Sequence, residues 1–280
     1  MLRGTNRLPL ERRAQILGIL AEGSSLRAAS RLADVSINTV TKLLVDVGAA
    51  CERYQDRALR NLKCKRIQCD EIWSFVYAKA KNLPEQYAGG FGYGDVWTWT
   101  ALDADSKLVP SWSVGRRDAF TAQAFIRDLA DRLATRVQLT TDGHKVYLEA
   151  VEGAFGSEID YAMLVKMYEG DSGRDAQARY SPPSCLGTRT VCIAGQPDPR
   201  HISTSFVERQ NLSMRMGMRR FTRLTNAFSK KVDNHKAALA LYFMHYNFAR
   251  IHKTLRVTPA MEAGVADHVW SLDEIARLEN

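Results

Sequence analysis

The spacing of hydrophobic residues changes from helical to alternating after the first quarter of the chain. In that first quarter, apolar positions recur every three to four residues and predict short helices. These run over Leu10–Glu22, over Ser25–Ala33, and from an N-cap at Ser36 through Val45, with Gly48 closing the last one. Small or apolar residues occupy the positions where the second and third helices would cross. This pattern is typical of a helix-turn-helix motif, although an ordinary three-helix bundle shows it too.

The turn and the start of the third predicted helix carry the residues that would contact DNA. Asp34 stands at the turn, where its short polar side chain tolerates the left-handed conformation. In a helix-turn-helix motif the exposed start of the second helix enters the major groove. The candidate DNA-binding residues are therefore Ser36, Asn38, Thr39 and Lys42. The next segment, Glu52–Lys65, has the composition of a basic helical connector.

From Arg66 onward, the alternation of apolar and polar residues predicts strands. They cover Arg66–Tyr77, Asp95–Asp103, Leu108–Gly115, Val137–Thr141 and Ile159–Met167. Amphipathic helices are predicted between them, over Asp118–Ala134 and Tyr147–Phe155. A meander of antiparallel strands followed by alternating helices and strands indicates a mixed sheet covered by helices. The predicted fold class is therefore α/β, with an all-α helix-turn-helix domain before it.

The last part of the chain begins with a proline-rich segment, Gly170–Ser203, which is too long for an ordinary connection. We interpret this segment as an insertion or a mobile loop, with a small strand over Thr188–Ile193. Helices are predicted over Ser205–Thr222 and Ala237–His252. A His-Tyr-Asn run at 245–247 lies in the second of these helices, and we interpret it as packing rather than catalysis.

The composition of the chain favours a polyanionic binding partner. The chain has 280 residues and a formal net charge of +8, which favours nucleic acid, although many basic proteins bind none. No apolar run approaches the ~20 residues of a membrane span, and no signal-peptide core is present. We therefore expect a cytoplasmic, nucleoid-associated protein with no membrane partner. The five cysteines are scattered, which argues against a disulfide framework and against a zinc site.

One acidic residue stands within the first predicted strand. Asp70 shares a face of that strand with Ile72 and Val76, whereas Glu71 points to the other face. A carboxylate among apolar neighbours is costly unless it is paired, hydrogen-bonded or bound to a cation. A turn residue or a simple ion pair would explain Asp70 equally well, so its interpretation depends on further carboxylates.

Asp142 follows the fourth predicted strand, at the end where open α/β sheets place ligand-binding groups. It also fits a common Asp-Gly turn with Gly143. When the first and fourth strands are neighbours, Asp70 and Asp142 lie side by side, and their charges repel each other unless cations bridge them. Such a pair favours Mg²⁺, which is typically held by one or two carboxylates together with phosphate oxygens of the substrate.

Glu208 lies near the start of the helix predicted from Ser205. The two residues match a capping box, in which Glu208 would have a purely structural role. Several arginines on and just after the same helix favour a metal site beside a bound phosphodiester backbone instead, since a solvated face usually mixes charges more evenly. These candidate DNA-binding residues are Arg209, Arg215, Arg219, Arg220 and Arg223.

Several segments of the sequence together resemble the DDE transposases of bacterial insertion sequences, and the insertion-sequence-one type most closely. The matching runs are Cys69–Phe75, Thr141–Tyr147 and Ser203–Leu212, the last continuing through Arg219–Lys231. The resemblance covers roughly residues 66–264. An N-terminal cysteine zinc finger, which members of this type often carry, is not present in the sequence.

The resemblance implies an RNase H-like catalytic core in which Asp70, Asp142 and Glu208 hold two divalent metal ions, Mg²⁺ or Mn²⁺. It implies a transposase that binds the terminal inverted repeats of an element, cuts the DNA there and joins the freed ends to target DNA. A homo-oligomer is implied because two ends must be held together. The chain would comprise a helix-turn-helix domain (1–50), a basic linker (51–65), the catalytic domain (66–232, with the insertion 170–203) and a C-terminal helical tail (233–280).

Two other functions are compatible with the same residues. The first is a helix-turn-helix regulator with an inactive RNase H-like domain, but inactivation would leave no reason to keep Asp70, Asp142 and Glu208 together. The second is a hydrolytic DNA nuclease, whose active site would be almost indistinguishable because water and a DNA 3′-OH are equivalent nucleophiles there. The end-binding segment and the long C-terminal helices favour transposition.

Overall fold

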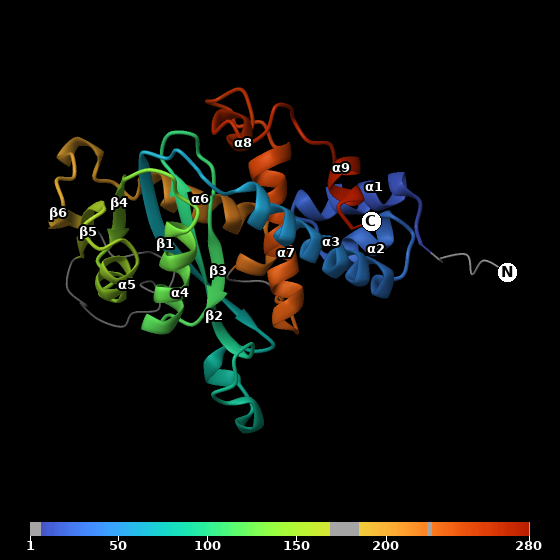
Figure 1. Ribbon diagram of the computed structural model, residues 1–280. Coiled ribbons are helices and arrows are strands. Elements are labelled where there is room, and N and C mark those ends of the chain that lie inside the picture. The colour runs from blue at the N-terminus through green and yellow to red at the C-terminus, as the bar shows by residue number, and fades with distance from the viewer. Residues whose placement is uncertain (1–6, 169–184, 223–225, 280) are drawn as a thin grey trace.

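A six-stranded mixed sheet lies at the centre of the computed structural model, which describes residues 7–168, 185–222 and 226–279 (Figure 1). The strands are β1 (Arg66–Val76), β2 (Gly94–Asp103), β3 (Trp112–Gly115), β4 (Val137–Asp142), β5 (Ile159–Tyr168) and β6 (Cys185–Ala194). Their order in the sheet is β3-β2-β1-β4-β5-β6. β1 pairs antiparallel with β2 and parallel with β4, and β4 pairs parallel with β5. The expected fold class, an RNase H-like mixed sheet flanked by helices, is confirmed.

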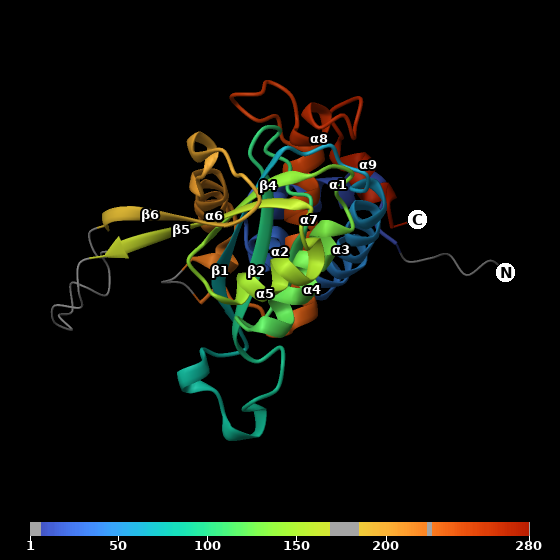
Figure 2. The ribbon, with the colours of Figure 1, turned by 60° about the vertical axis from the view of Figure 1, so that its left-hand side comes forward.

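Helices cover both faces of this sheet. They are α1 (Leu10–Ala21), α2 (Leu26–Leu32), α3 (Ile37–Ala58), α4 (Ala119–Ala130), α5 (Val146–Phe155), α6 (Ser205–Gly217), α7 (Val232–Met244), α8 (Pro259–Glu262) and α9 (Leu272–Arg277). α4 and α5 pack on each other over one face, and α6 packs against β1 and β2 on the other (Figure 2). α3 packs along α7, and α9 packs on α1, so the first and last helices of the chain lie together (Figure 1).

The predicted end of the third helix at Gly48 is wrong, because α3 continues without interruption to Ala58. Gly48 is buried where α3 crosses α7, and a Cβ atom at this position would lie 2.6 Å from the backbone of Ala237. The glycine therefore allows a close approach of two helices rather than a helix end. The extension also makes the first half of the predicted basic connector part of α3.

Contacts between distant parts of the chain join the N-terminal helices to the remainder. The Gln55 side-chain amide of α3 donates to the Ala240 carbonyl of α7 at 3.1 Å, and the Arg13 guanidinium of α1 donates to the Ala276 carbonyl of α9 at 3.0 Å. Asp34 has a φ of 47°, so the left-handed turn predicted between α2 and α3 is confirmed. The division of the chain at residues 50, 65 and 232 stays a prediction.

The third strand begins later than predicted, at Trp112, because a side chain occupies the backbone before it. The amide of Val109 donates to Asn247 Oδ1, and the Val109 carbonyl accepts from Asn247 Nδ2, both at 3.0 Å. Asn247 is fully buried in a π-helical turn, His245–Ala249, that follows α7. The Tyr246 hydroxyl of the same turn donates to a backbone carbonyl at 2.9 Å. The packing role predicted for the His-Tyr-Asn run is confirmed for these two residues.

The predicted insertion contributes an additional edge strand to the sheet. β6 pairs antiparallel with β5, and the two strands extend away from the rest of the sheet (Figure 2). β6 is longer than the small strand predicted over Thr188–Ile193. Residues 170–184 of the predicted insertion lie outside the described residues. Among the helices that the structure describes, none is long and apolar enough to cross a membrane.

Candidate metal and active site

Asp70 and Asp142 lie side by side on the two central strands of the sheet, as predicted. The parallel pairing of β1 with β4 ends where Cys69 is opposite Thr141, and the next residue on each strand is an aspartate. β4 ends at Asp142, whereas β1 continues to Val76, so the two carboxylates meet where the pairing of these strands stops. The adjacency of two strands that are distant in sequence thus brings the two carboxylates together.

Glu208 of α6 lines the same cavity as the two aspartates. This cavity has a volume of about 430 Å³, and its lining includes Asp70, Asp142, Glu208, Arg117, His144 and Lys166. The Glu208 carboxylate accepts a hydrogen bond from Lys166 Nζ of β5 at 2.6 Å and another from the Thr204 hydroxyl. The structure therefore places all three predicted carboxylates around one cavity, with a lysine already paired to the third.

The capping-box interpretation of Glu208 is wrong. Helix α6 begins at Ser205 and its N-cap residue is Thr204, so Ser205 is not in the N-cap position. The backbone amide of Glu208 donates to the Thr204 carbonyl at 3.0 Å, as an ordinary helical amide does. The Glu208 side chain is thus free of the capping role and is directed to Lys166 and the cavity.

The environment of Asp70 is unfavourable for a bare negative charge. Burial, together with the nearby carboxylates of Glu71 and Asp142, raises the pKa of Asp70 to about 7. The Asn211 amide nitrogen of α6 donates to Asp70 Oδ2 at 2.8 Å, and the Glu71 backbone amide donates to Asp70 Oδ1 at 2.9 Å. On the other strand, the His144 amide donates to Asp142 Oδ1 at 3.0 Å. Both aspartates are therefore held in place while their charges repel each other.

Glu71 is an acidic residue of this site that the sequence analysis did not identify as a site residue. Its side chain is fully buried on the α4–α5 face of the sheet. It accepts from Arg117 Nε at 2.8 Å and from the Tyr147 hydroxyl of α5 at 3.1 Å. Burial and the charge of Asp142 raise the pKa of Glu71 above its usual value. The sequence contains an indication of this second buried carboxylate, because a strand with acidic residues at consecutive positions must place a charge on each face.

The residues around the cavity fit a divalent cation. Asp70, Glu71 and Asp142 each offer a carboxylate oxygen, and these oxygens lie within 4.8 Å of one another. Carboxylate oxygens are the ligands that Mg²⁺ and Mn²⁺ prefer in proteins, and a bound cation would relieve the repulsion among them. Both Glu71 oxygens already accept hydrogen bonds, from Arg117 and Tyr147, so Asp70 and Asp142 are the better candidates for ligands. Glu208 is not part of this close group, and its carboxylate is paired with Lys166.

The predicted DNA-binding residues of α3 lie at its start. Ser36, Asn38 and Lys42 are exposed, whereas Thr39 is half-buried. The Ser36 hydroxyl also accepts from the Asn38 amide at 3.2 Å and so caps the helix. Lys42 forms an ion pair with Asp46 on the same helix. These side chains are accessible, but one of them already has a structural function.

The predicted DNA-binding arginines differ in exposure and in the direction of their side chains. Arg209 and Arg219 are exposed, and Arg215 is half-buried. Arg220 is directed inward, where it donates to the Ser229 hydroxyl at 2.8 Å, and burial lowers its pKa to about 10. Arg223 lies outside the described residues. The structure thus separates Arg220 from the exposed members of the set.

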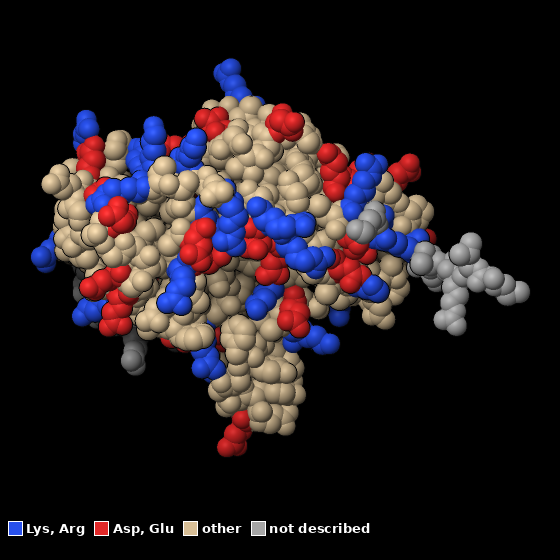
Figure 3. Space-filling view, in the orientation of Figure 1, with Lys and Arg blue, Asp and Glu red and all other residues tan. Residues whose placement is uncertain are grey.

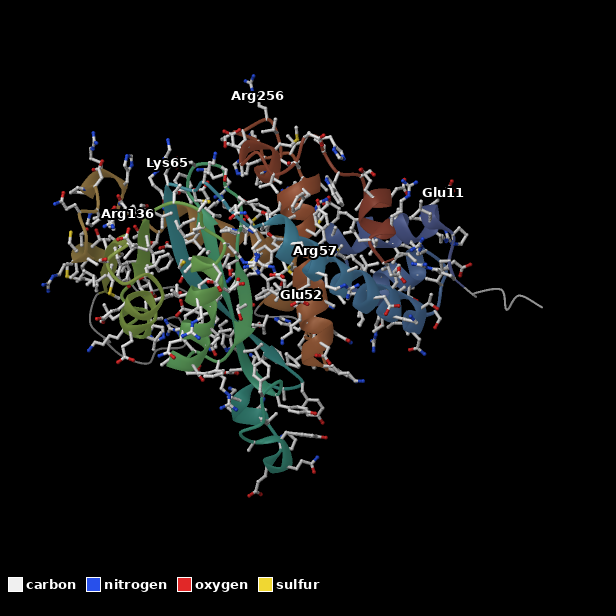
Figure 4. All side chains as sticks on the ribbon, in the orientation of Figure 1. Glu11, Glu52, Arg57, Lys65, Arg136 and Arg256 are labelled. Atoms are coloured by element: carbon white, nitrogen blue, oxygen red, sulfur yellow. The ribbon has the colours of Figure 1, made fainter. Side chains whose placement is uncertain are left out.

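Basic residues are distributed widely over the rest of the molecule. In the predicted basic connector, Arg57 of α3 and Lys65, which precedes β1, are both exposed (Figure 4). On the face shown in Figure 3, Lys and Arg side chains are interspersed with Asp and Glu side chains. The net positive charge is therefore not gathered into one patch on this face.

Fold and site together define an RNase H-like domain with a carboxylate-lined cavity at the end of its parallel strands. No protein-family model and no curated protein matches the chain. Among solved structures, the Mos1 Strand Transfer Complex is similar at a TM-score of 0.25 and 14% identity, over 86% of this chain and 79% of that one. The Mos1 transposase paired-end complex with left transposon end gives a TM-score of 0.22 and 13% identity, over 57% and 61%. At these values the likeness carries no argument about activity.

Proposed function

We propose that the protein is a DDE-type transposase that catalyses metal-dependent cleavage of DNA strands and their transfer to target DNA. The observation that carries the proposal is the juxtaposition of Asp70 and Asp142 on adjacent parallel strands, with Glu208 lining the same cavity. Carboxylates collected from three separate elements would repel each other without a cation to bind. If these carboxylates had only a structural role, their mutual repulsion would destabilise the fold without a compensating interaction.

In this proposal Asp70 and Asp142 hold divalent metal, with Glu208 contributing from α6. Two Mg²⁺ or Mn²⁺ ions, when bound there, would activate a water or a DNA 3′-OH and stabilise the leaving oxygen. The protein's own contribution is orientation. Asn211 fixes the Asp70 carboxylate, and the His144 amide fixes that of Asp142. Lys166 holds Glu208 at the cavity and would be its partner until a metal ion competes for the same carboxylate.

The element recognised would be a bacterial insertion sequence of the insertion-sequence-one type. We assign recognition of its terminal inverted repeats to the exposed start of α3, with Ser36, Asn38, Thr39 and Lys42 facing the major groove. Arg209, Arg215, Arg219 and Arg223 would contact the phosphate backbone near the cavity. Arg220 is the weakest member of the proposed set, because its guanidinium is directed into the protein. Bringing two element ends together requires a homo-oligomer.

The test is strand transfer by the purified protein in Mg²⁺, with a duplex that carries the element's own terminal repeat. Joined products are expected from the natural protein, and we expect Asp70→Asn and Asp142→Asn to lose them while they still bind DNA. Glu11→Gln is the matched control, because Glu11 is an exposed carboxylate in the first turn of α1, far from the cavity (Figure 4). Cleavage without joining would indicate a nuclease, and binding without either reaction would indicate a regulator.

A further inference from the structure

We infer that Arg117 binds the phosphate group at which DNA is cut and that buried Glu71 positions it for this task. The inference rests on the proposed function, since it concerns a phosphodiester in the carboxylate-lined cavity. Arg117 lies in the turn between β3 and α4 and is one of the residues that line this cavity. Its side chain is 40% exposed, so a bound DNA strand has access to it.

Three contacts hold the Arg117 guanidinium in one orientation. Its Nε donates to Glu71 Oε1 at 2.8 Å, and its Cζ lies over the Trp97 ring at 4.8 Å from the centroid. One terminal nitrogen, Nη2, lies 3.8 Å from Asp142 Oδ2. A guanidinium carries five N–H donors in a rigid fork, and Glu71 accepts from only one edge of it. Nη2 is directed toward Asp142, so donors beyond the one that Glu71 accepts lie at the cavity.

A phosphodiester entering this cavity meets negative charge on several sides. Asp70, Asp142 and Glu208 line the cavity, and bound metal would offset their charge and contact some of the phosphate oxygens. A fixed positive group that does not titrate would add a contact to a non-bridging phosphate oxygen that the metal does not bind. Arginine suits this function because its planar fork matches phosphate geometry and its charge is permanent.

Glu71 has the features of a residue that positions Arg117. Its side chain has no solvent exposure, and a buried carboxylate is costly unless it is paired. Tyr147, itself fully buried, donates to the second oxygen, so Glu71 is held from α5 while it holds Arg117. The guanidinium is thus linked to the rigid sheet and helix rather than left on a flexible turn.

The test measures DNA binding in Ca²⁺, an ion that is used to hold DNA without turnover. Duplexes that carry the terminal repeat are prepared with a single neutral methylphosphonate at successive positions. We expect Arg117→Ala to weaken binding of the natural duplex by about tenfold to a hundredfold, the effect of one charge-assisted contact. The loss should vanish when the methylphosphonate replaces one particular phosphate. An equal loss at every position would overturn the inference.

Arg116 provides the matched control, because it is the preceding arginine and donates to the Gly89 carbonyl instead of the cavity. Arg116→Ala should leave the position dependence unchanged. Arg117→Lys keeps the charge and the intact Glu71, yet one ammonium group cannot serve Glu71 and a phosphate in the same fork geometry. It should lose most of the same affinity. Full affinity in Arg117→Lys would reduce Arg117 to a nonspecific charge and contradict the inference.

The positioning role of Glu71 is tested with Glu71→Gln, alone and combined with Arg117→Ala. The two changes should be non-additive, because they remove one coupled unit. Mn²⁺ binding, followed by electron paramagnetic resonance, should persist in Glu71→Gln and be lost in Asp142→Asn. Loss of Mn²⁺ in Glu71→Gln would make Glu71 a metal ligand and overturn the assignment. Absence of strand transfer would refute the proposed function, whereas the methylphosphonate result requires no turnover and is judged separately.

Discussion

The buried side chain of His235 in α7 should make the protein less stable as the pH falls below the pKa of a free histidine. The side chain has no solvent exposure, and the only hydrogen bond described for it is the 3.3 Å contact between its Nε2 and the Ser74 hydroxyl of β1. Its Nδ1 is buried with no partner among the described residues. Burial, with a smaller contribution from the Arg220 charge, lowers the pKa of His235 to about 3. The folded protein therefore holds this imidazole in its neutral form.

The sign of the effect follows from proton uptake by the unfolded chain. A histidine in the unfolded protein has a pKa near 6.5, so the unfolded state binds a proton below this pH while the folded state does not. The stability associated with the neutral side chain is complete above pH 6.5 and is lost progressively as the pH falls toward 3. At about pH 5 the loss amounts to about 2 kcal/mol, because each pH unit corresponds to about 1.4 kcal/mol.

The assay is urea unfolding, followed by tryptophan fluorescence at about pH 7.5 and about pH 5, for the natural protein and for His235→Gln. Glutamine keeps a group that can bond Ser74 but does not titrate. The free energy of unfolding of His235→Gln should fall by about 2 kcal/mol less between the two pH values. His201→Gln, at an exposed histidine, is the control and should behave like the natural protein. Equal pH dependence in His235→Gln and the natural protein would refute the reasoning.

Further predictions concern α3, with a comparison position in α5. Gly48→Ala should destabilise the protein by about 1–3 kcal/mol in urea unfolding, because its new methyl group would meet Ala237 at 2.6 Å. Gly153→Ala, at a helical glycine with nothing within 4 Å of the new Cβ, should instead stabilise it by about 0.5–1 kcal/mol; destabilisation at both positions would contradict the packing argument. Lys42→Ala should weaken binding to a terminal-repeat duplex and lower the slope of log affinity against log salt by about one, whereas Asn38→Ala should weaken binding without changing the slope. Unchanged affinity in both variants would exclude the start of α3 from DNA recognition.

The local pattern of the sequence determined the strands, most helices and the positions of the candidate carboxylates. The sequence pattern of a strand (alternation) or of a helix (a 3.6-residue period) shows which side of that element is buried. This pattern can be recognised without knowing which elements pack against it. Asp70 and Asp142 were predicted to lie together because one strand pairing, that of β1 with β4, was enough to join them. That pairing is confirmed.

Only the tertiary structure decided what the individual side chains contact. Gly48 looked like a helix end, and its true role depends on α7, far along the chain. Glu71 and Arg117 are 46 positions apart, and Lys166 and Glu208 are 42 apart. The periodicity of a single helix or strand does not indicate such pairs, because they form only when the sheet and its helices pack together. The Arg220 guanidinium is directed into the protein and the buried Glu71 carboxylate is part of the site. Both positions result from packing in the assembled fold, which a local sequence pattern does not show.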